Sequence, residues 1–386
     1  MITWVYIRMT SYSSPLLKGF LSDHTSQESV VSITTEPNII YFEDARNSTD
    51  LNFDFIIRGL TDKKLIIKFI KVALYDEFDA LLTFKHLNHN GVGTPGIHTI
   101  GKFEINGKEV LDVFNPFHSF PKEMKIDHLR YMFTFSDSET KNEYYYGNIV
   151  VKPVVFHQKV ELAIPVKGMS TILDGHDFYS HHRRFAMSVV RQFTNNVFSS
   201  NFSRYAIDFT IIGTDGNTRR MVPEEFKDNY DFHFTDVKQF YTHETIVYSP
   251  ANGEIVEVVN DLNDLYDTPF NMDRTVQNNS LKEIAGNYII IKHNNNEFSH
   301  LFHLLKQSIE ASVGQKVKKG QAIAKIGFSG AATTYSHLHY QLMDGEDFLI
   351  DNPLPCKFSD VTIIQGKTEV KYDRIMLDTG DFILAH

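Results

Sequence analysis

Two histidines in the C-terminal part of the chain are spaced so that they could act together. The sequence Ser336-His337-Leu338-His339-Tyr340 carries imidazoles at positions i and i+2. Successive side chains of a β-strand point to opposite faces, so a strand here would place both imidazoles on one face. That face would present two nitrogen ligands for a metal, or two acid/base groups. The alternative interpretation is a polar strand surface without chemistry.

A single carboxylate stands among apolar residues in a second segment. Residues 204–209 read RYAIDF, which predicts a strand that carries Asp208. Burying a carboxylate is unfavourable unless it is paired with a cation or bound to a metal. Asp208 is therefore a candidate metal ligand or ion-pair partner. A surface aspartate at the end of a strand is the alternative.

A glycine-punctuated turn follows a third candidate histidine. His303 precedes residues 313–321, which read VGQKVKKGQ. Similar turns occur in lipoyl and biotinyl carrier domains, so the turn alone indicates only a hybrid-barrel-like sheet. A carrier needs a modifiable lysine at a hairpin tip, and none stands out here. Carriers also lack the histidine upstream of the turn and the His-Leu-His sequence downstream of it.

The elements that must position these residues are strands, and they fall into two predicted domains. In residues 1–160, short apolar or alternating runs are separated by turn residues, which predicts an antiparallel β-sandwich. The runs are Leu51–Ile57, Leu65–Leu74, Leu81–Phe84, His128–Phe135 and Tyr144–Val155. This domain shows no cluster of catalytic residue types, so we expect an accessory or docking role for it.

Residues 161–386 form the second predicted domain, and the fold class expected for the whole chain is all-β. Its predicted strands lie within Arg204–Ile212, Thr245–Val259 and Tyr288–His293. Residues 249–253 read SPANG, a composition that predicts a hairpin turn. A polar insertion at 260–285, rich in Asn and Asp, is long enough to be either disordered or functional.

The composition of the 386-residue chain excludes several classes of protein. A net charge of −10 gives no basic field for a phosphate backbone, so we expect no nucleic-acid partner. The single cysteine, Cys356, excludes an intramolecular disulfide and a zinc site built from several thiolates. No stretch of 18 or more apolar residues occurs, so no transmembrane segment is expected. Residues 1–17 make a poor signal peptide because they lack a long apolar region.

The order of the motifs resembles that of the lysostaphin/LytM-type zinc endopeptidases, over about residues 168–342. The motifs that carry the resemblance are, in chain order, GHDFYSHHRR, RYAIDF, YSPANGEIVEV, GNYIIIKH, FHL, SVGQKVKKGQAIAKIGFSG and SHLHYQL. The resemblance implies an antiparallel-sheet, hybrid-barrel-like peptidase domain. It also implies a zinc ion held by a His, an Asp and the second His of a His-x-His motif.

Carried over to this chain, the resemblance implies that Asp208 and His339 are zinc ligands. It implies that His303 and His337 are the catalytic histidines that do not bind the metal. One of these two would take a proton from the water and the other would stabilise the oxyanion, and the sequence does not apportion the roles. The chain has no His-Glu-x-x-His sequence, so strands must supply the site.

One position departs from the family pattern. The usual first ligand is a His four residues before the Asp, and this chain has Arg204 there. The nearest substitutes are His181 and His182, and we expect His182 to be the third ligand. His176 could orient a ligand without binding the metal, or be only a loop residue. Two His and one Asp would leave a fourth position on the zinc open for water.

These features predict a zinc-dependent endopeptidase. The resemblance implies peptidoglycan stem or cross-bridge peptides as the substrate, and a cell-envelope or secreted location. The alternative is a catalytically inactive LytM-like binding or regulatory module, which Arg204 at the usual ligand position favours. A carrier or structural hybrid-barrel domain is a third interpretation, disfavoured by the three histidines. The bond cleaved, the export route and the oligomeric state stay open.

Overall fold

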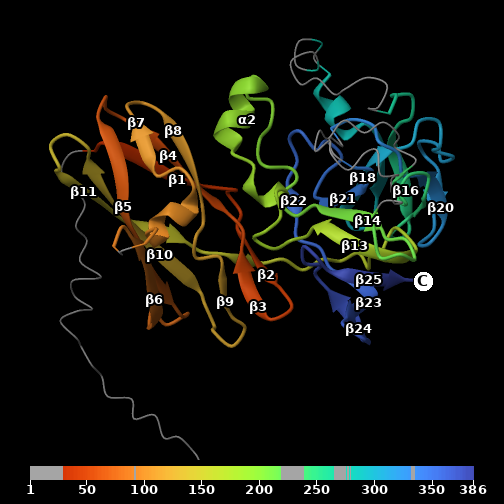
Figure 1. The fold of residues 1–386 in the computed structure, drawn as a ribbon, viewed down its shortest axis with the longest axis horizontal. Helices are drawn as coiled ribbons and strands as arrows, with labels where there is room; N and C mark the ends of the chain where they lie inside the picture. Colours follow the sequence, from red (N-terminus) through yellow and green to blue (C-terminus); the bar gives the residue numbers. More distant parts are fainter. Residues whose placement is uncertain are drawn as a thin grey trace, which may run out of the picture. The chain divides into compact units, whose positions relative to one another are not determined.

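The computed structural model describes residues 29–90, 93–218, 239–264, 275, 278, 280–331 and 335–386. These residues form mostly antiparallel strands with a few short helices, so the predicted all-β class is confirmed (Figure 1). No helix in this part of the chain is long and apolar enough to cross a membrane. The segment at 1–17 and half of the predicted insertion at 260–285 lie outside the described residues.

The described residues divide into two compact units whose segments alternate along the chain. One unit takes residues up to 34 together with 57–111 and 126–152, and the other takes 35–56, 112–125 and 153–386. Two stretches of the N-terminal region therefore belong with the C-terminal region. The division at residue 160 stays a prediction for the domain boundary.

The first unit is built on a five-stranded sheet with the order β11-β10-β5-β6, in which β7 also pairs with β5. Its strands are β5 (Lys64–Tyr75), β6 (Leu81–Asn88), β7 (Glu104–Asn106), β10 (His128–Asp137) and β11 (Glu143–Val151), and η1 (Gly96–Ile100) is a short helix. On β5 the buried Leu65 and Ile67 alternate with more exposed residues, and Ile70, Val72 and Leu74 resume the alternation after a bulge. This is the pattern of a strand that covers a core with one face.

A second group of strands forms two smaller sheets. β1 (Val31–Glu36), β4 (Asp54–Gly59) and β8 (Val110–Phe114) are ordered β1-β4-β8, and β2 (Tyr41–Asp44), β3 (Ser48–Leu51), β9 (Ser119–Pro121) and β12 (Val154–Val155) are ordered β12-β2-β3-β9. The antiparallel pairs β2·β3 and β3·β9 and the parallel pair β12·β2 hold the latter sheet together. This sheet belongs to the second unit.

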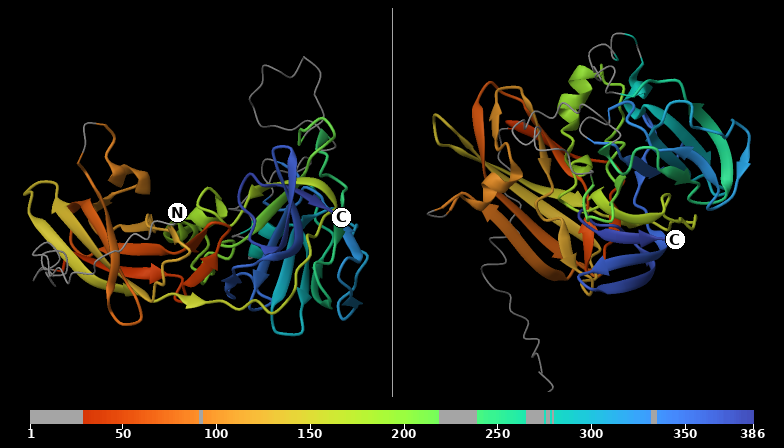
Figure 2. Two further views of the ribbon diagram at one scale, coloured as in Figure 1. Left: turned by 90° about the horizontal axis from the view of Figure 1, so that it is seen from below. Right: turned by 45° about the vertical axis from the view of Figure 1, so that its right-hand side comes forward.

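The second unit also contains the largest sheet of the described chain, with the order β19-β16-β17-β18-β21-β14-β13-β25-β23-β24. Figure 2 shows these strands from two further sides. Their bounds are β13 (Gly168–Asp174), β14 (Ile207–Ile211), β16 (Gly253–Val259), β17 (Asn287–Lys292), β18 (Phe298–Leu304), β19 (Lys316–Val317), β21 (Leu338–Met343), β23 (Phe358–Gln365), β24 (Thr368–Ile375) and β25 (Phe382–Ala385). β22 (Pro353–Leu354) adds to β21, and η2 (His182–Arg184), α2 (Met187–Phe193) and η5 (Leu281–Ala285) are short helices. The apolar run Ile289–Ile291 on β17, between β16 and β18, is fully buried.

The hairpin predicted at 249–253 is wrong. The strand before this turn, β15 (Ile246–Tyr248), pairs with β20 (Ala322–Lys325), whereas β16 after the turn pairs with β17 and β19. The turn residues therefore carry the chain from one sheet to another. The backbone N–H of Ser249 donates to the carbonyl of Gln321, and its hydroxyl donates to the carbonyl of Ala251. The turn composition was interpreted correctly, but the partner strands come from distant sequence.

Candidate metal centre

Asp208 and His339 face each other across two neighbouring strands. Asp208 lies on β14 and His339 on β21, and the antiparallel register places them directly opposite each other. Side chains of directly opposite residues lie on the same face of a sheet. The Nδ1 of His339 lies 3.1 Å from Oδ1 of Asp208, and both side chains are buried.

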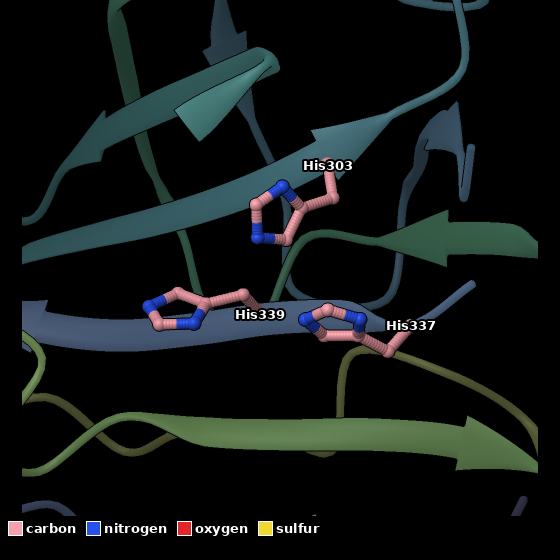
Figure 3. Close-up of side chains that lie close together, drawn as sticks. All are labelled: His303, His337 and His339. Atoms are coloured by element: carbon pink, nitrogen blue, oxygen red, sulfur yellow. The ribbon is translucent and has the colours of Figure 1, made fainter. Parts of the chain in front are cut away.

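His337 joins them from the same stretch of chain. It immediately precedes β21, and its Nε2 lies 3.4 Å from Oδ2 of Asp208. Figure 3 shows the imidazoles of His337 and His339 on the same side of the strand. The prediction that these two histidines share one face is therefore confirmed.

His303 reaches the cluster through a rare backbone conformation. On β18, Phe302 is paired with His339, and their rings stack with centroids 5.1 Å apart. The next residue of a regular strand would point to the other face. His303 instead has a φ of 63°, in the left-handed region, and its ring centroid lies 4.8 Å from that of His337 (Figure 3). Such conformations are concentrated at functional sites.

Of the two candidate substitutes for the missing ligand, His182 is the one that faces Asp208. Its Nε2 lies 3.5 Å from Oδ2 of Asp208, and its ring centroid lies 4.8 Å from that of His339. The Nδ1–H of His181 instead donates to Asp174 over 2.7 Å, and this imidazole is 54% exposed. The two residues stand at the start of η2, so their side chains point in different directions.

Arg204, at the position where the resemblance would place a ligand, is bonded to other residues. Its Nη2 donates to Oδ2 of Asp54 over 2.7 Å and its Nη1 donates to Oδ1 of Asn52 over 3.1 Å. A guanidinium has no lone pair to offer a metal. His176 is likewise engaged elsewhere, with its Nδ1 3.0 Å from the carbonyl of Leu377.

The buried carboxylate of Asp208 has no hydrogen-bond partner among the described residues, on either oxygen. Imidazole nitrogens of His182, His337 and His339 nevertheless surround it at 3.1–3.5 Å. A buried carboxylate without a hydrogen bond is unfavourable, so this arrangement fits a cation held between the groups. Nitrogen and carboxylate oxygen are donor atoms that zinc accepts.

Among the residues that the structure describes, two overlapping sets of side chains have ligand atoms within 4.8 Å of one another. They are His182, Asp208 and His339, and His303, His337 and His339. The first set contains the unpartnered carboxylate, which would balance part of the charge of a divalent cation. The chemistry of the donors therefore favours the first set as the place for a metal.

The hydrogen bonds of the other ring nitrogens determine which nitrogens carry free lone pairs. Nε2 of His339 lies 3.0 Å from Oε1 of Gln341, an acceptor, so this nitrogen carries the proton and Nδ1 is left bare toward Asp208. Nδ1 of His303 donates to the carbonyl of Ser329 over 2.8 Å, and Nδ1 of His337 donates to that of Tyr335 over 3.0 Å. Both of these histidines therefore keep Nε2 free to accept a proton.

Burial and mutual proximity determine the charge states. Burial lowers the pKa of His182 to about 3, and it also lowers the pKa values of His303 and His337. These imidazoles are therefore neutral at pH 7, the state in which a ring binds a metal or accepts a proton. Burial alone would raise the pKa of Asp208, but the surrounding imidazoles outweigh it and keep that pKa below its usual range.

The cluster opens into a pocket of 310 Å³. Apolar and aromatic side chains form part of its wall, and the candidate ligands and catalytic histidines form the rest. The lining residues outside the cluster are His181, Phe185, Phe202, Ser203, Ile284, Phe302, Ala331 and Tyr335. An apolar pocket with a few convergent polar groups is a typical ligand-binding site.

Several residues of the centre were not found from the sequence. Gln341 stands two residues after His339, so the same i, i+2 rule that paired the histidines could have identified it. The carbonyls of Ser329 and Tyr335 and the carboxylate of Asp174 gave no signal. Backbone acceptors carry no information in their side chains, and Asp174 acts on His181 from the end of β13.

Comparison with known proteins finds a family match in the C-terminal region, which includes His303, His337 and His339. Residues 236–349 match Peptidase family M23. Over 98 residues the chain is 31% identical to the peptidoglycan DD-endopeptidase ShyC of Vibrio cholerae. The aligned residues make up 25% of this chain and 21% of that protein. Over 59 residues it is 44% identical to the peptidoglycan DD-endopeptidase ShyA of the same organism. These residues make up 15% of this chain and 13% of that protein. The chain thus spans about a fifth or less of the length of these relatives.

Among solved structures, the catalytic domain of the antimicrobial peptidase lysostaphin from Staphylococcus simulans matches with 21% identity and a TM-score of 0.21, over 31% of this chain and 80% of that one. The matches in sequence agree with the resemblance expected from the order of the motifs. Residues 236–349 of this chain are thus similar to Peptidase family M23, and the regions of sequence identity are shared with two peptidoglycan DD-endopeptidases.

Proposed function

We propose that this protein is a zinc-dependent endopeptidase that hydrolyses peptide bonds. The observation that carries the proposal is the convergence of an unpartnered, buried Asp208 with the free nitrogens of His182 and His339. The match of residues 236–349 to Peptidase family M23 and two DD-endopeptidase relatives support it.

In this proposal His182, Asp208 and His339 hold the zinc. When bound there, zinc lowers the pKa of a coordinated water toward about 7 and polarises the scissile carbonyl. Gln341 keeps the Nδ1 of His339 free of its proton, and the neutral state of His182 leaves its Nε2 available. The protein itself therefore arranges the protonation states that the ligands need.

His303 and His337 are proposed as the proton-transfer groups. Each donates Nδ1–H to a backbone carbonyl, which fixes the ring and directs Nε2 away from that carbonyl. A neutral imidazole so held can accept a proton from water and, once protonated, can donate to the developing oxyanion or to the leaving amine. The geometry supports both residues and does not divide the two roles between them.

The substrate proposed is a peptide of peptidoglycan, in the stem or the cross-bridge. It rests on the named activity of the relatives ShyC and ShyA. The inactive-module alternative rested on Arg204 at the usual ligand position. Because His182 supplies an imidazole to the same carboxylate, that departure does not leave the centre short of a ligand.

The test is metal analysis and digestion with the purified full chain. We expect about one zinc per protein and conversion of cross-linked muropeptides to monomers, both lost on treatment with a chelator and restored by added zinc. An Asp208→Asn variant serves as the inactive control. A protein that binds no zinc and cleaves no peptidoglycan peptide would contradict the proposal, and zinc binding without cleavage would favour the regulatory alternative.

A further inference from the structure

Two buried arginines connect the candidate metal centre to a segment that is distant in sequence. Arg183 directly follows His182, and Arg204 stands four residues before Asp208. Their exposed fractions are 4% and 1%. Both guanidiniums reach residues 41–54, which we call the anchor segment. It comprises β2, β3 and the first residue of β4, and it belongs to the same compact unit as the centre.

Arg204 and the anchor segment are joined by reciprocal bonds. The guanidinium donates to the carboxylate of Asp54 and to the side-chain carbonyl of Asn52, at 2.7 and 3.1 Å. The amide of Asn52 donates in return to the backbone carbonyl of Arg204, over 3.2 Å. Side chain and backbone at the entrance to β14 are thus both fixed. Asp208 follows Arg204 by four residues, as the second residue of β14, so its position depends on this attachment.

Arg183 makes the second attachment. Its Nη2 donates to the backbone carbonyl of Leu51 over 2.7 Å. The carboxylate of Glu43 is 1% exposed, has no hydrogen-bond partner among the described residues and interacts more strongly with the charge of Arg183 than with any other charge. Because His182 is the preceding residue, an attachment at Arg183 limits the directions in which the His182 imidazole can point.

The loop that carries His182 is held at its other end as well. His176 begins this loop, and its Nε2 lies 4.0 Å from Oδ2 of Asp50 in the anchor segment. From within the same unit, the amide of Asn201 donates to the backbone carbonyl of His182 over 2.7 Å. The backbone of the candidate ligand therefore has fixed contacts on several sides.

A second metal in this buried cluster is the competing interpretation, since Glu43, Asp50 and His176 each have a ligand atom without a hydrogen bond. These three residues are not among the sets whose ligand atoms converge within 4.8 Å. The positive charge of Arg183 already acts on Glu43 and opposes the rise in its pKa that burial causes. An attachment built on arginine explains the cluster without a second cation.

We propose that the anchor segment is part of the metal centre, and that Arg183 and Arg204 are positioning residues that hold His182 and Asp208 at the spacing a metal needs. This inference rests on the proposed zinc site. The match to Peptidase family M23 at 236–349 contains neither the anchor segment nor these two candidate ligands. The N-terminal region thus contributes to the centre itself and does more than precede it.

The test compares Arg183→Gln with Arg184→Gln in the full chain. Arg184 is a matched control because it is the next residue, is exposed and bonds only within its own loop, to the carbonyls of Tyr179 and Ser180. Zinc affinity is measured by competition with a chelator, and the geometry by the visible spectrum of the Co²⁺-substituted protein. We expect Arg183→Gln to weaken zinc binding by about 10 to 100-fold and to alter the cobalt spectrum. Arg184→Gln should match the wild type in both.

A second variant separates positioning from the effect of an unpaired buried charge. Arg183→Met combined with Glu43→Met removes the guanidinium and the Glu43 carboxyl together, so neither is left buried without the other and the variant should fold, but it still lacks the bond to Leu51. We expect the same loss of zinc affinity in this double variant, measured against Arg184→Met. Wild-type affinity and spectrum in the folded double variant would overturn the inference. Absence of zinc from the wild type would instead overturn the proposed function.

Discussion

At the scale of single residues, the centre separates side chains that would hold a metal from a neighbour that would not. We predict that His182→Ala, Asp208→Ala and His339→Ala each lose zinc, because each removes a proposed ligand. His181→Ala is the control, since its imidazole bonds to Asp174. Zinc per protein, measured after gel filtration, should fall well below one in the first three variants only. Full zinc in any of those three would remove that residue from the ligand set.

Substitution of His303 or His337, the two histidines that keep Nε2 free, should have a different effect from substitution of a proposed ligand. We predict that His303→Ala and His337→Ala retain zinc but lose turnover by about 10² or more, as expected for an acid/base or oxyanion group. Metal content and initial rates on a cross-linked peptide, measured on the same samples, check this. Near wild-type rates in either variant would exclude that residue from the mechanism.

Much of the centre could be predicted from the sequence, and the exceptions have physical reasons. The i, i+2 spacing of His337 and His339 already implied a common face, and the motif order pointed to Asp208. The choice between His181 and His182 was open in spacing alone, because adjacent residues at a helix start differ only in direction. The left-handed φ of His303 is set by tertiary contacts, which leave no mark on the sequence.

At the scale of elements, the turns at Gly286 and Gly330 pack so closely that one added methyl group should disturb them. Gly330 has a φ of 73°, and a Cβ there would lie 2.2 Å from the backbone nitrogen of Gly286. The preceding residue, Ser329, supplies the carbonyl that orients His303. We predict that Gly330→Ala lowers both the unfolding temperature and turnover.

Gly320→Ala is the matched control for that change. Gly320 also has a positive φ, of 78°, but a Cβ there would meet nothing within 4 Å. It should show only the backbone penalty of about 1–2 kcal/mol for a left-handed residue, without loss of turnover. Thermal unfolding and initial rates measure the two effects, and equal loss of turnover in both variants would refute the role given to the Gly330 turn.

Protonation of His176 should make the free energy of unfolding depend on pH. Burial alone would lower the pKa of His176, but the carboxylates of Asp378 and Glu43 outweigh it and raise that pKa to about 9. A pKa that is higher in the folded state stabilises the protein below pH 6.5, and this stabilisation is lost as the pH rises toward 9. The shift corresponds to about 3 kcal/mol.

The check is the unfolding free energy of the metal-free protein at pH 6.5 and at pH 9, for the wild type and for His176→Gln. We predict that the wild type loses more stability over this interval than the variant. An identical change in both proteins would show that His176 is not protonated in the folded state.

The positions of strands along the chain were easier to predict than which strands pair with each other. The strands around residues 65–74 and 128–135 follow from alternation and turn residues, and both exist as β5 and β10. The turn at 249–253 joins two strands of different sheets, because β20 from much later in the chain pairs with β15. Local composition specifies a turn, but long-range pairing decides what the turn connects.

At the scale of the whole molecule, the interleaving of the two units was not visible in the sequence. Residues 35–56 and 112–125 join the C-terminal unit through contacts between segments far apart along the chain. We predict that a fragment of residues 161–386 is less stable and binds zinc more weakly than the full chain. Without residues 35–56, Arg204 loses its ion pair with Asp54 and Arg183 loses its bond to Leu51, so the neighbours of His182 and Asp208 are no longer held.

Chelator competition and thermal unfolding of the fragment beside the full chain check that prediction. A fragment that is as stable as the full chain and binds zinc equally well would show that the predicted boundary at residue 160 delimits a complete peptidase domain. It would also show that the anchor segment is dispensable.

The central claim is that zinc is held by His182, Asp208 and His339, and diffraction at the zinc absorption edge tests it most directly. A crystal of the full chain with zinc should show one anomalous peak between Nε2 of His182, the carboxylate of Asp208 and Nδ1 of His339. His303 and His337 should lie beside the peak without coordinating the ion. A peak centred among His303, His337 and His339, or no peak in the pocket at all, would contradict the account.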